Sequence, residues 1–306
     1  MRISRWVAVG LIAGQIATAQ AQRSPAAPPD PNDVRIVITK LGGNVYGIDG
    51  RGGRMAALVG PDGVFLVDSQ FAAVSDKLVA AIGDLSPAPL KFLVNTHVHG
   101  DHTGGNENFA KLGVTILGRP NLREQLLHPR PAPGNGQVPP VAPALALPVV
   151  VFDAPTTVYL DGETIRLIPL PPAHTDGDTA VKFVDGDVLM TGDVFRSVGF
   201  PAAAVTNGGS FLGTLEAMET LISLAGPATK VVPGHGPVTD RAALVAHRDM
   251  IVTVRDRIAK ALDEGKTPDE IRALKPTADF EATVGGPANF IGQFVDGLIA
   301  ELSAER

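Results

Sequence analysis

The chain has 306 residues, of which 44% are hydrophobic, enough for one large domain or two small ones with a buried core. It carries 26 Lys and Arg against 32 Asp and Glu, a net charge of −6, which argues against the basic surface that nucleic-acid binding requires. The sequence contains no Cys, so disulfides are excluded and every metal ligand must be a nitrogen or oxygen atom.

Residues 1–21 have the pattern of a secretory signal peptide. Two arginines precede an apolar run from Trp6 to Ala19, and a small-x-small cleavage site follows it and ends at Ala21. The alternative is an uncleaved anchor, but the run is broken by Gly and Gln and is too short to cross about 30 Å of hydrocarbon. We expect a periplasmic or secreted mature chain with no membrane insertion. Residues 22–33 are Pro-rich and predict a flexible lead-in before a domain of residues 34–306.

From residue 34 onward, apolar runs typical of strands alternate with segments of helical spacing. In chain order, the predicted strands are 35–40, 45–48, 54–59, 64–67, 90–94, 114–117, 157–159, 164–169, 180–184, 188–191 and 230–232. The predicted helices are 75–85, 106–111, a short one from about Asn121, 210–224, a long one from Thr239 or Asp240 to near Gly265, one opened by the Thr267–Glu270 capping box, and 287–304. This order predicts an α+β fold in which two packed sheets carry helices on both outer faces, with 265–306 as a helical extension.

The Pro-rich segment, residues 128–150, contains too much Pro for regular structure, and we expect a long loop there. Long loops within compact domains are often functional rims or lids. His128, within this segment, is expected to be solvated or to lie on a substrate rim. His247 lies within a helical pattern, and we expect a packing or surface role for it.

Four residues with metal-binding side chains fall within six positions of the chain. His97, His99, Asp101 and His102 follow the predicted strand 90–94 directly, in the Gly-rich run NTHVHGDHTGGN. A strand that ends in such a loop can turn alternate side chains toward one point, and neutral imidazole and carboxylate are suitable zinc ligands. The alternative, a chance gathering of polar residues in a loop, is disfavoured by this density of ligand types.

Three further residues of the same kind follow strand-like runs later in the chain. They are His174 in PPAHTDGD, Asp193 in TGDVF and His235 in VPGHGP. Each lies where a loop is expected to leave a sheet edge. With the first run they make five His and two Asp, enough for two metal ions that share one carboxylate. We predict two Zn²⁺ ions, although the same ligand types also accept iron or manganese.

These four motifs, in this order, resemble those of the metallo-β-lactamase superfamily over most of residues 35–240. The resemblance implies a four-layer αβ/βα sandwich with the metals at the sheet edge. It assigns His97, His99 and His174 to the first zinc, Asp101, His102 and His235 to the second, and Asp193 as the bridge between them. Asp68 resembles the buried Asp that supports the ligand loop in this family, the alternative being a plain turn residue.

The resemblance also implies a chemistry. Two metal ions would lower the pKa of a shared water toward ~7, and the resulting hydroxide would attack a carbonyl carbon. Asp101 would be the catalytic residue that orients this nucleophile and moves its proton. Export favours a β-lactamase-like hydrolase that acts on a small molecule, either a lactam or a similar cyclic amide or ester.

Three residues are candidates for substrate binding. Arg196 lies three residues after Asp193, as the carboxylate-binding Lys of one β-lactamase subclass lies after its metal-binding Cys; the alternative is a surface charge. Asn207 roughly matches that subclass's substrate-binding Asn, although Asn-Gly is also common in turns. Phe71, after a strand end, offers an apolar wall.

The chain departs from that subclass at Asp193, where the subclass has Cys. Lactonases and thioester hydrolases share the Asp, so an esterase, lactonase or thioesterase on the same site stays an alternative. A non-hydrolytic, metal-dependent periplasmic helper protein is a further one.

Overall fold

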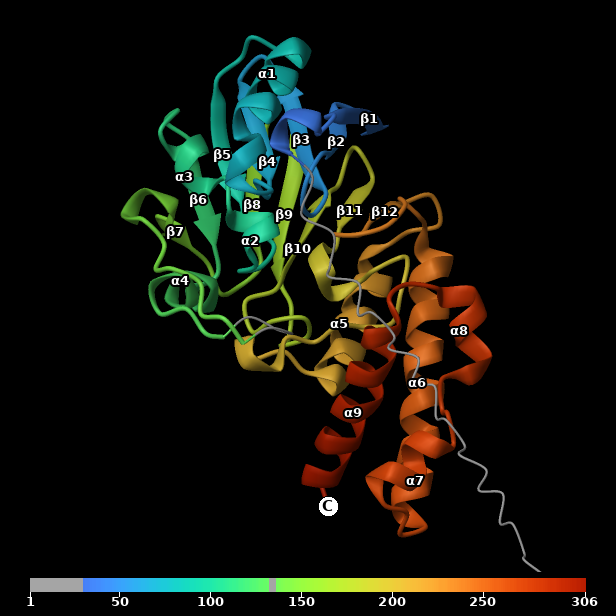
Figure 1. Cartoon of the computed structure of the whole chain (residues 1–306). Coiled ribbons are helices and arrows are strands. Elements are labelled where there is room, and N and C mark those ends of the chain that lie inside the picture. The colour runs from blue at the N-terminus through green and yellow to red at the C-terminus, as the bar shows by residue number, and fades with distance from the viewer. Residues whose placement is uncertain (1–29, 132–135) are drawn as a thin grey trace, which may run out of the picture.

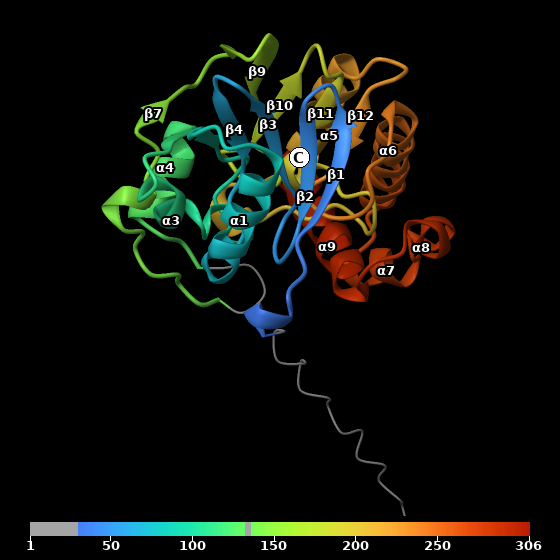
Figure 2. The same ribbon diagram turned by 90° about the horizontal axis from the view of Figure 1, so that it is seen from above.

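Two β-sheets lie face to face at the centre of the molecule, and helices cover both outer sides (Figures 1 and 2). The computed structural model describes residues 30–131 and 136–306. The predicted signal peptide and most of the lead-in lie outside the described residues. The last lead-in residues form a short 3-10 turn, η1 (Pro31–Asp33), which the Asp30 side chain caps.

Within the described residues, the first sheet has seven strands, which lie side by side in chain order. They are β1 (Val37–Gly42), β2 (Val45–Asp49), β3 (Met55–Gly60), β4 (Gly63–Val67), β5 (Leu90–Val94), β6 (Thr115–Gly118) and β7 (Val150–Val151). The first four strands are antiparallel, and β4 to β7 run parallel to one another. The parallel strands therefore end at the same edge of the sheet, where the loops after β4 and β5 begin.

The second sheet has five strands in the described part of the chain, in the order β12-β11-β10-β9-β8. Their bounds are β8 (Thr156–Leu160), β9 (Glu163–Pro169), β10 (Thr179–Phe183), β11 (Val188–Met190) and β12 (Lys230–Val232). All neighbours are antiparallel except β11 and β12, which are parallel. The chain therefore leaves β11 and β12 at one common edge.

Alternating side chains of the strands divide the core into layers. In β4, Phe65 and Val67 pack between the two sheets, whereas Val64 and Leu66 pack beneath the helices of the first sheet. This period of two is what a strand buried on both faces requires. Aliphatic side chains of both sheets fill the space between them, and burial of this apolar surface supplies most of the force that holds the sheets together.

Helices form the two outer layers. The first sheet is covered by α1 (Ser75–Leu85), α2 (Gly100–Thr103), α3 (Asn106–Ala110) and α4 (Pro120–Leu127), together with the 3-10 turns η2 (Ala72–Val74) and η3 (Ala144–Ala146). The second sheet is covered by α5 (Phe211–Leu224) and α6 (Arg241–Asp263), and the C-terminal helices α7 (Pro268–Ala273), α8 (Ala278–Val284) and α9 (Ala288–Ala304) lie beside these two (Figure 1). The 3-10 turns η4 (Gly192–Val194) and η5 (Val205–Asn207) lie in the chain between β11 and α5. The predicted four-layer αβ/βα sandwich with C-terminal helices is therefore confirmed.

The C-terminal helix α9 packs against α5 and α6 and shares their core, in which Phe211 and Phe294 are in contact. Glu301 on α9 also accepts hydrogen bonds from the Ser210 hydroxyl and from the backbone N–H groups of Phe211 and Leu212, at 2.8–2.9 Å. A carboxylate at a helix N-terminus satisfies free N–H groups and complements the helix dipole. This contact fixes α9 against the start of α5.

The structure differs from the sequence-based elements at a few places. The Pro-rich segment was expected to lack regular structure, but it contains η3 and ends in the two-residue strand β7. Helix α8 was not predicted, and α2 forms within the ligand run itself, which was expected to be a loop.

Among the described residues, no helix combines the length and the apolar character needed to span a membrane.

Candidate metal centre

The seven predicted ligands meet at one edge of the two sheets. His97 and His99 follow β5 directly, and α2 carries the next two ligands of the run. The other three lie on loops of the second sheet: His174 after β9, Asp193 in η4 after β11, and His235 after β12. Residues from both sheets therefore contribute to a single cluster, because the two sheets end at the same side of the sandwich.

His97, His99 and His174 form the first group, whose potential ligand atoms lie within 4.8 Å of one another. The Nδ1 atom of His99 is 2.9 Å from Nε2 of His174. The Nε2 atom of His97 is buried and has no hydrogen-bond partner. The opposite nitrogens of two of these rings are held in place, since Nδ1 of His97 contacts the Thr96 hydroxyl at 3.1 Å and Nδ1 of His174 contacts the Ala202 carbonyl.

Asp101, His102 and His235 form the second group. Oδ2 of Asp101 is 3.0 Å from Nε2 of His235 and 3.6 Å from Nε2 of His102. Asp193 lies between the two groups: its Oδ1 is 3.3 Å from His102 Nε2, and its Oδ2 is 3.4 Å from His235 and 3.7 Å from His174. This is the position that a bridging carboxylate would take.

Asp68 holds the ligand loop from below. Its carboxylate accepts hydrogen bonds from the Thr96 backbone N–H at 2.7 Å and from the Thr96 hydroxyl at 2.8 Å, and it contacts His102 Nδ1 at 2.7 Å. The residue has a left-handed backbone, with φ of 63°, which is unusual outside glycine. These contacts orient the His102 ring so that its other nitrogen faces the cluster.

Sequence reasoning missed the glycines that make room for the ligands. A Cβ atom on Gly53 would lie 2.0 Å from His102 Cε1, and one on Gly234 would lie 2.0 Å from Asp193 Oδ1. Gly192 has a φ of 53°, and a Cβ there would lie 2.9 Å from the Thr96 side chain. A side chain at any of these positions would displace a ligand or its support. The sequence shows that each glycine is next to a candidate ligand or in a Gly-rich turn. Only the tertiary structure shows that a side chain there would overlap a candidate ligand or the residue that supports it.

Burial and neighbouring charges set the protonation of the ligands. Burial lowers the pKa of His97 and His174, and it lowers the pKa of His99 to about 4. Burial alone would also lower the pKa of His102, but the carboxylates of Asp68 and Asp193 outweigh it and raise that pKa well above its usual value. Three imidazoles are therefore neutral at pH 7, the form in which histidine binds a metal.

The two carboxylates of the cluster stay ionised. Burial would raise the pKa of Asp101, but a hydrogen bond with His235 and the proximity of His102 lower it. For Asp193 the proximity of His102 and His174 outweighs burial and lowers the pKa well below its usual range. Both side chains are thus available as anionic ligands at neutral pH.

The residues present fit bound metal. His97 Nε2 is buried and has no hydrogen-bond partner, and His102 Nε2 and Asp193 Oδ1 are buried, lie 3.3 Å from each other and form no hydrogen bond. A buried polar atom without a hydrogen bond costs about 1–3 kcal/mol, so a cation among these three neighbouring atoms would be favourable. Five imidazoles and two carboxylates form a nitrogen and oxygen donor set that suits zinc and also accepts iron or manganese.

A pocket of about 430 Å³ opens over the cluster, and we call it the metal-centre pocket. Phe71 lies on its wall, as expected from the sequence. Arg196 also lines it: the guanidinium is 3.1 Å from Asp193 Oδ2, its Nε is buried without a partner, and its centre lies 5.1 Å from the centroid of the Phe290 ring. Phe290 and Gln293, both on α9, complete the wall. Sequence reasoning missed them, because α9 is more than fifty residues from the last ligand motif.

Asn207 does not line this pocket. Its amide donates to Gln125 Oε1 at 2.7 Å, and its Oδ1 is 3.4 Å from His99 Nε2. The side chain therefore supports a candidate ligand from behind and faces a neighbouring cavity.

The two remaining histidines lie apart from the cluster: His128 is exposed, as expected, and His247 is buried against Phe195, which is the packing role.

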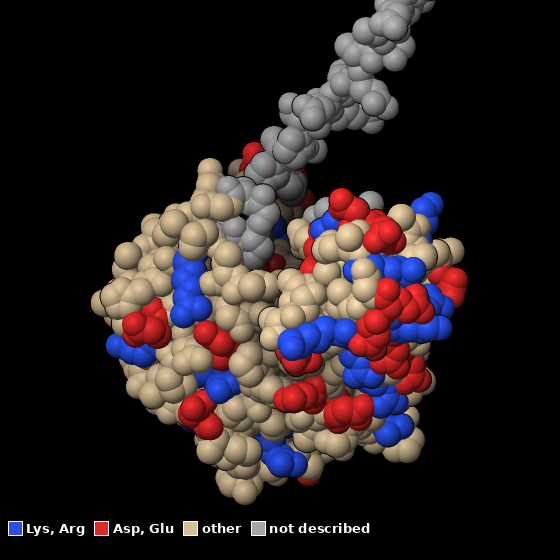
Figure 3. Space-filling model, turned by 90° about the horizontal axis from the view of Figure 1, so that it is seen from below, with Lys and Arg blue, Asp and Glu red and all other residues tan. Residues whose placement is uncertain are grey.

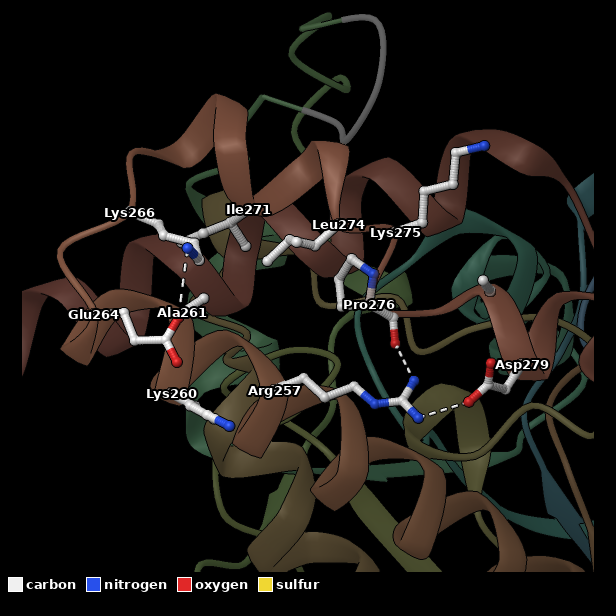
Figure 4. Close-up of a pocket in the computed structure, with 11 residues that line it drawn as sticks. Arg257, Lys260, Ala261, Glu264, Lys266, Ile271, Leu274, Lys275, Pro276 and Asp279 are labelled. Atoms are coloured by element: carbon white, nitrogen blue, oxygen red, sulfur yellow. Dashed lines mark hydrogen bonds and ion pairs between the residues drawn. The ribbon is translucent and has the colours of Figure 1, made fainter.

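A cavity of about 460 Å³ lies between α6, α7 and the loop that leads to α8 (Figure 4). Arg257, within it, donates to the Pro276 carbonyl at 2.7 Å and to Asp279 at 2.6 Å, and Lys266 is 3.4 Å from Glu264. It shares no residue with the metal-centre pocket, and its ion pairs are those of an exposed helical surface.

Comparisons with known proteins agree with this geometry. The family model of the metallo-beta-lactamase superfamily matches residues 49–235, more than half of the chain. The matched region contains all seven predicted ligands. The chain belongs to the metallo-beta-lactamase superfamily, a class of hydrolases, and its cluster of His and Asp residues could hold metal.

Among curated proteins, a linear primary-alkylsulfatase from Pseudomonas sp. (strain ATCC 19151) is 26% identical over 254 residues, which are 69% of this chain and 47% of the alkylsulfatase. The chain thus spans about half the length of this relative.

Three solved structures share the fold. A metallo-beta-lactamase from Pontibacter korlensis has a TM-score of 0.59 at 19% identity, with 71% of this chain and 99% of that chain covered. The DIM-1 metallo-beta-lactamase has a TM-score of 0.58 at 18% identity, with 72% and 99% covered. The stereoselective inverting sec-alkylsulfatase Pisa1 from Pseudomonas sp. has a TM-score of 0.64 at 16% identity, with 87% and 50% covered. At these identities the likeness concerns the fold alone.

Proposed function

We propose that the chain is an exported dinuclear zinc hydrolase that cleaves a small anionic lactam or a similar cyclic amide or ester. The observation that carries the proposal is the convergence of seven ligand-type side chains, three of them with unpaired buried atoms, beneath one pocket that also contains a cation, Arg196. Bound metal ions would supply Lewis acidity toward a carbonyl oxygen and increase the acidity of water. Export rests on the sequence of residues 1–21.

The chain's own residues would bind and orient the substrate. Asp101 lines the pocket as an ionised carboxylate, with Oδ2 held 3.0 Å from His235, and can accept a proton from a water molecule beside it. Arg196 would bind the anionic group of the substrate, and Phe290 keeps the guanidinium plane in place. Phe71 and Phe290 offer apolar surface that displaces water around the scissile bond.

The test is turnover of a chromogenic cephalosporin by the purified mature chain loaded with zinc. We expect hydrolysis that disappears in the His97→Ala variant, because that change removes one of the three imidazoles of the first group. The variant also serves as the control for contaminating enzymes. Turnover by the zinc-loaded chain no faster than by His97→Ala would refute the lactam proposal.

A second candidate is the hydrolysis of a linear ester, including a sulfate ester. Two observations favour it: the match to a linear primary-alkylsulfatase over 69% of this chain, and the carboxylate of Asp193 where one β-lactamase subclass has a thiolate. A panel of linear esters, thioesters and primary alkyl sulfates, each assayed against the same His97→Ala control, distinguishes it from the hydrolysis of lactams and lactones. Stoichiometric metal binding with no turnover on any of these substrates would instead indicate the helper protein, and metal analysis of the purified chain separates zinc from iron.

A further inference from the structure

A second cavity, of about 330 Å³, lies on the far side of His99 from the metal-centre pocket. The two cavities share His99 and Gly100 in their walls, so they meet at the ligand run. On the side away from the cluster, the walls come from α4 and from the Pro-rich segment. We call this cavity the tail pocket.

The walls of the tail pocket are mainly apolar. Val98, Leu126, Pro140, Ala142 and Ala146 are among the residues that line it. The backbone N–H of Ala142 donates to the Leu126 carbonyl at 3.0 Å, which ties the Pro-rich segment to α4 and keeps the two walls together. A largely preformed apolar cavity of this size is typical of a small-molecule binding site.

The charged groups at the tail pocket already have partners. Arg130 is 3.6 Å from Asp176, and Glu107 is 3.0 Å from Lys111. The Gln125 side chain donates from Nε2 to the Asn207 carbonyl at 3.1 Å and accepts a hydrogen bond from the Asn207 side-chain amide at 2.7 Å. Among the described residues that line the cavity, the charged side chains Arg130 and Glu107 are therefore already paired, and the lining favours an apolar ligand.

The Pro-rich segment continues this apolar character onto the surface. Residues 131–152 contain no charged side chain. The segment and the adjoining strand expose six large hydrophobic residues: Val138, Val141, Leu145, Val149, Val150 and Val151. Figure 3 shows many charged side chains on the half of the molecule with the C-terminal helices, and fewer on the half around α4. An exposed apolar patch beside a cavity is typical of a binding surface.

We propose that the tail pocket binds the apolar acyl or alkyl portion of the substrate, while its anionic group and scissile bond occupy the metal-centre pocket. The proposal rests on the proposed function for the reacting end and adds the substrate class: an amphiphile whose tail extends past His99 and Gly100. The two cavities are adjacent and share these two lining residues, which is the argument for this occupant over an unrelated apolar partner.

The test is binding, so that it does not depend on turnover. The zinc-loaded mature chain is titrated calorimetrically with butanoate, hexanoate, octanoate and decanoate, whose carboxylate is the probe for the metal-centre pocket. Each buried methylene contributes about 0.8 kcal/mol, so affinity should rise about fourfold per methylene until the tail pocket is filled. Affinity that is independent of chain length, or no binding of any carboxylate, would overturn the proposal.

Two variants locate the tail. Ala142→Phe should fill the cavity and weaken decanoate binding at least tenfold, with butanoate unchanged. The matched control Ala144→Phe introduces the same ring two residues away, at an exposed position outside the cavity, and should behave as the parent. Leu126→Ala removes apolar surface that α4 contributes to the cavity and should weaken decanoate binding about three- to tenfold, which keeps the test valid if Ala142→Phe does not fold. Equal decanoate affinity in Ala142→Phe and Ala144→Phe would place the tail elsewhere.

The outcome is separable from that of the proposed function. Chain-length dependence that Ala142→Phe abolishes, together with no turnover of any substrate, would support the tail pocket and refute the hydrolase. Turnover of short substrates with affinity independent of chain length would support the hydrolase and refute the tail pocket.

Discussion

His247 is a buried histidine of α6 whose replacement should make the chain more resistant to acid. Its side chain is 8% exposed, its ring packs edge-on against Phe195 with centroids 5.2 Å apart, and its Nε2 has no hydrogen-bond partner. Burial lowers the pKa of His247 from 6.5 to about 4. We expect His247→Leu to remove this titration with a small effect on packing.

The magnitude follows from the shift in pKa. Because the folded state has the lower pKa, protonation favours the unfolded state. The stability due to the neutral ring is complete above pH 6.5 and is lost as the pH falls toward 4. Each pKa unit corresponds to about 1.36 kcal/mol, so the parent chain should lose about 2–3 kcal/mol between pH 7.5 and 4.5 through this group. The free energy of unfolding of His247→Leu should not show this pH-dependent loss.

The assay is urea unfolding of the metal-free mature chain at several pH values, followed by far-ultraviolet circular dichroism. Tryptophan fluorescence is unsuitable, since the single Trp of the sequence, Trp6, lies in the predicted signal peptide. Titration of the remaining groups cancels in the difference between variant and parent. His128→Leu is the matched control, because that ring is exposed. A stability difference between His247→Leu and parent that does not change with pH would refute the reasoning.

Three further results are expected. Asp68→Asn should weaken zinc binding about 10- to 100-fold in a chelator competition, because His102 loses the charged acceptor that orients its ring; unchanged affinity would contradict this role. Arg196→Ala should raise KM for anionic substrates about tenfold or more with partial recovery in Arg196→Lys, whereas an equal rise for neutral esters would indicate a structural effect. Glu301→Ala should lower the free energy of unfolding by about 1–3 kcal/mol in urea, since three donors at the start of α5 lose their acceptor; unchanged stability would show that water replaces it.

Local patterns were sufficient to predict most of the fold. Apart from β7, the strands of both sheets were found to within one or two residues, because apolar runs bounded by Gly, Pro and Asp are a local signal. The start of the helix after Ser210 and the Thr267–Glu270 capping box were found for the same reason, and of the two residues proposed to begin the long helix, Asp240 is the cap. Helix α8 and the two-residue strand β7 were missed, because each is short and depends on neighbours that are distant in the chain.

For the candidate site, too, some features could be predicted from the sequence and others could not. Its ligand types were visible in the sequence, since His97, His99, Asp101 and His102 are close together and each later ligand follows a strand. Which nitrogen of each ring faces the cluster was not visible, because that depends on partners from other segments, such as Asp68 for His102 and Ala202 for His174.

By itself, the sequence determined the types of candidate ligand and their placement after strands, because these depend on residues that are neighbours in the chain. The tertiary structure decided what surrounds them. It places Phe290 and Gln293 of α9 over Arg196, turns Asn207 away from the metal-centre pocket, and joins a second, apolar cavity to His99. The physical reason is that a pocket wall consists of side chains brought together by packing, and packing between distant segments has no signature in the order of the residues.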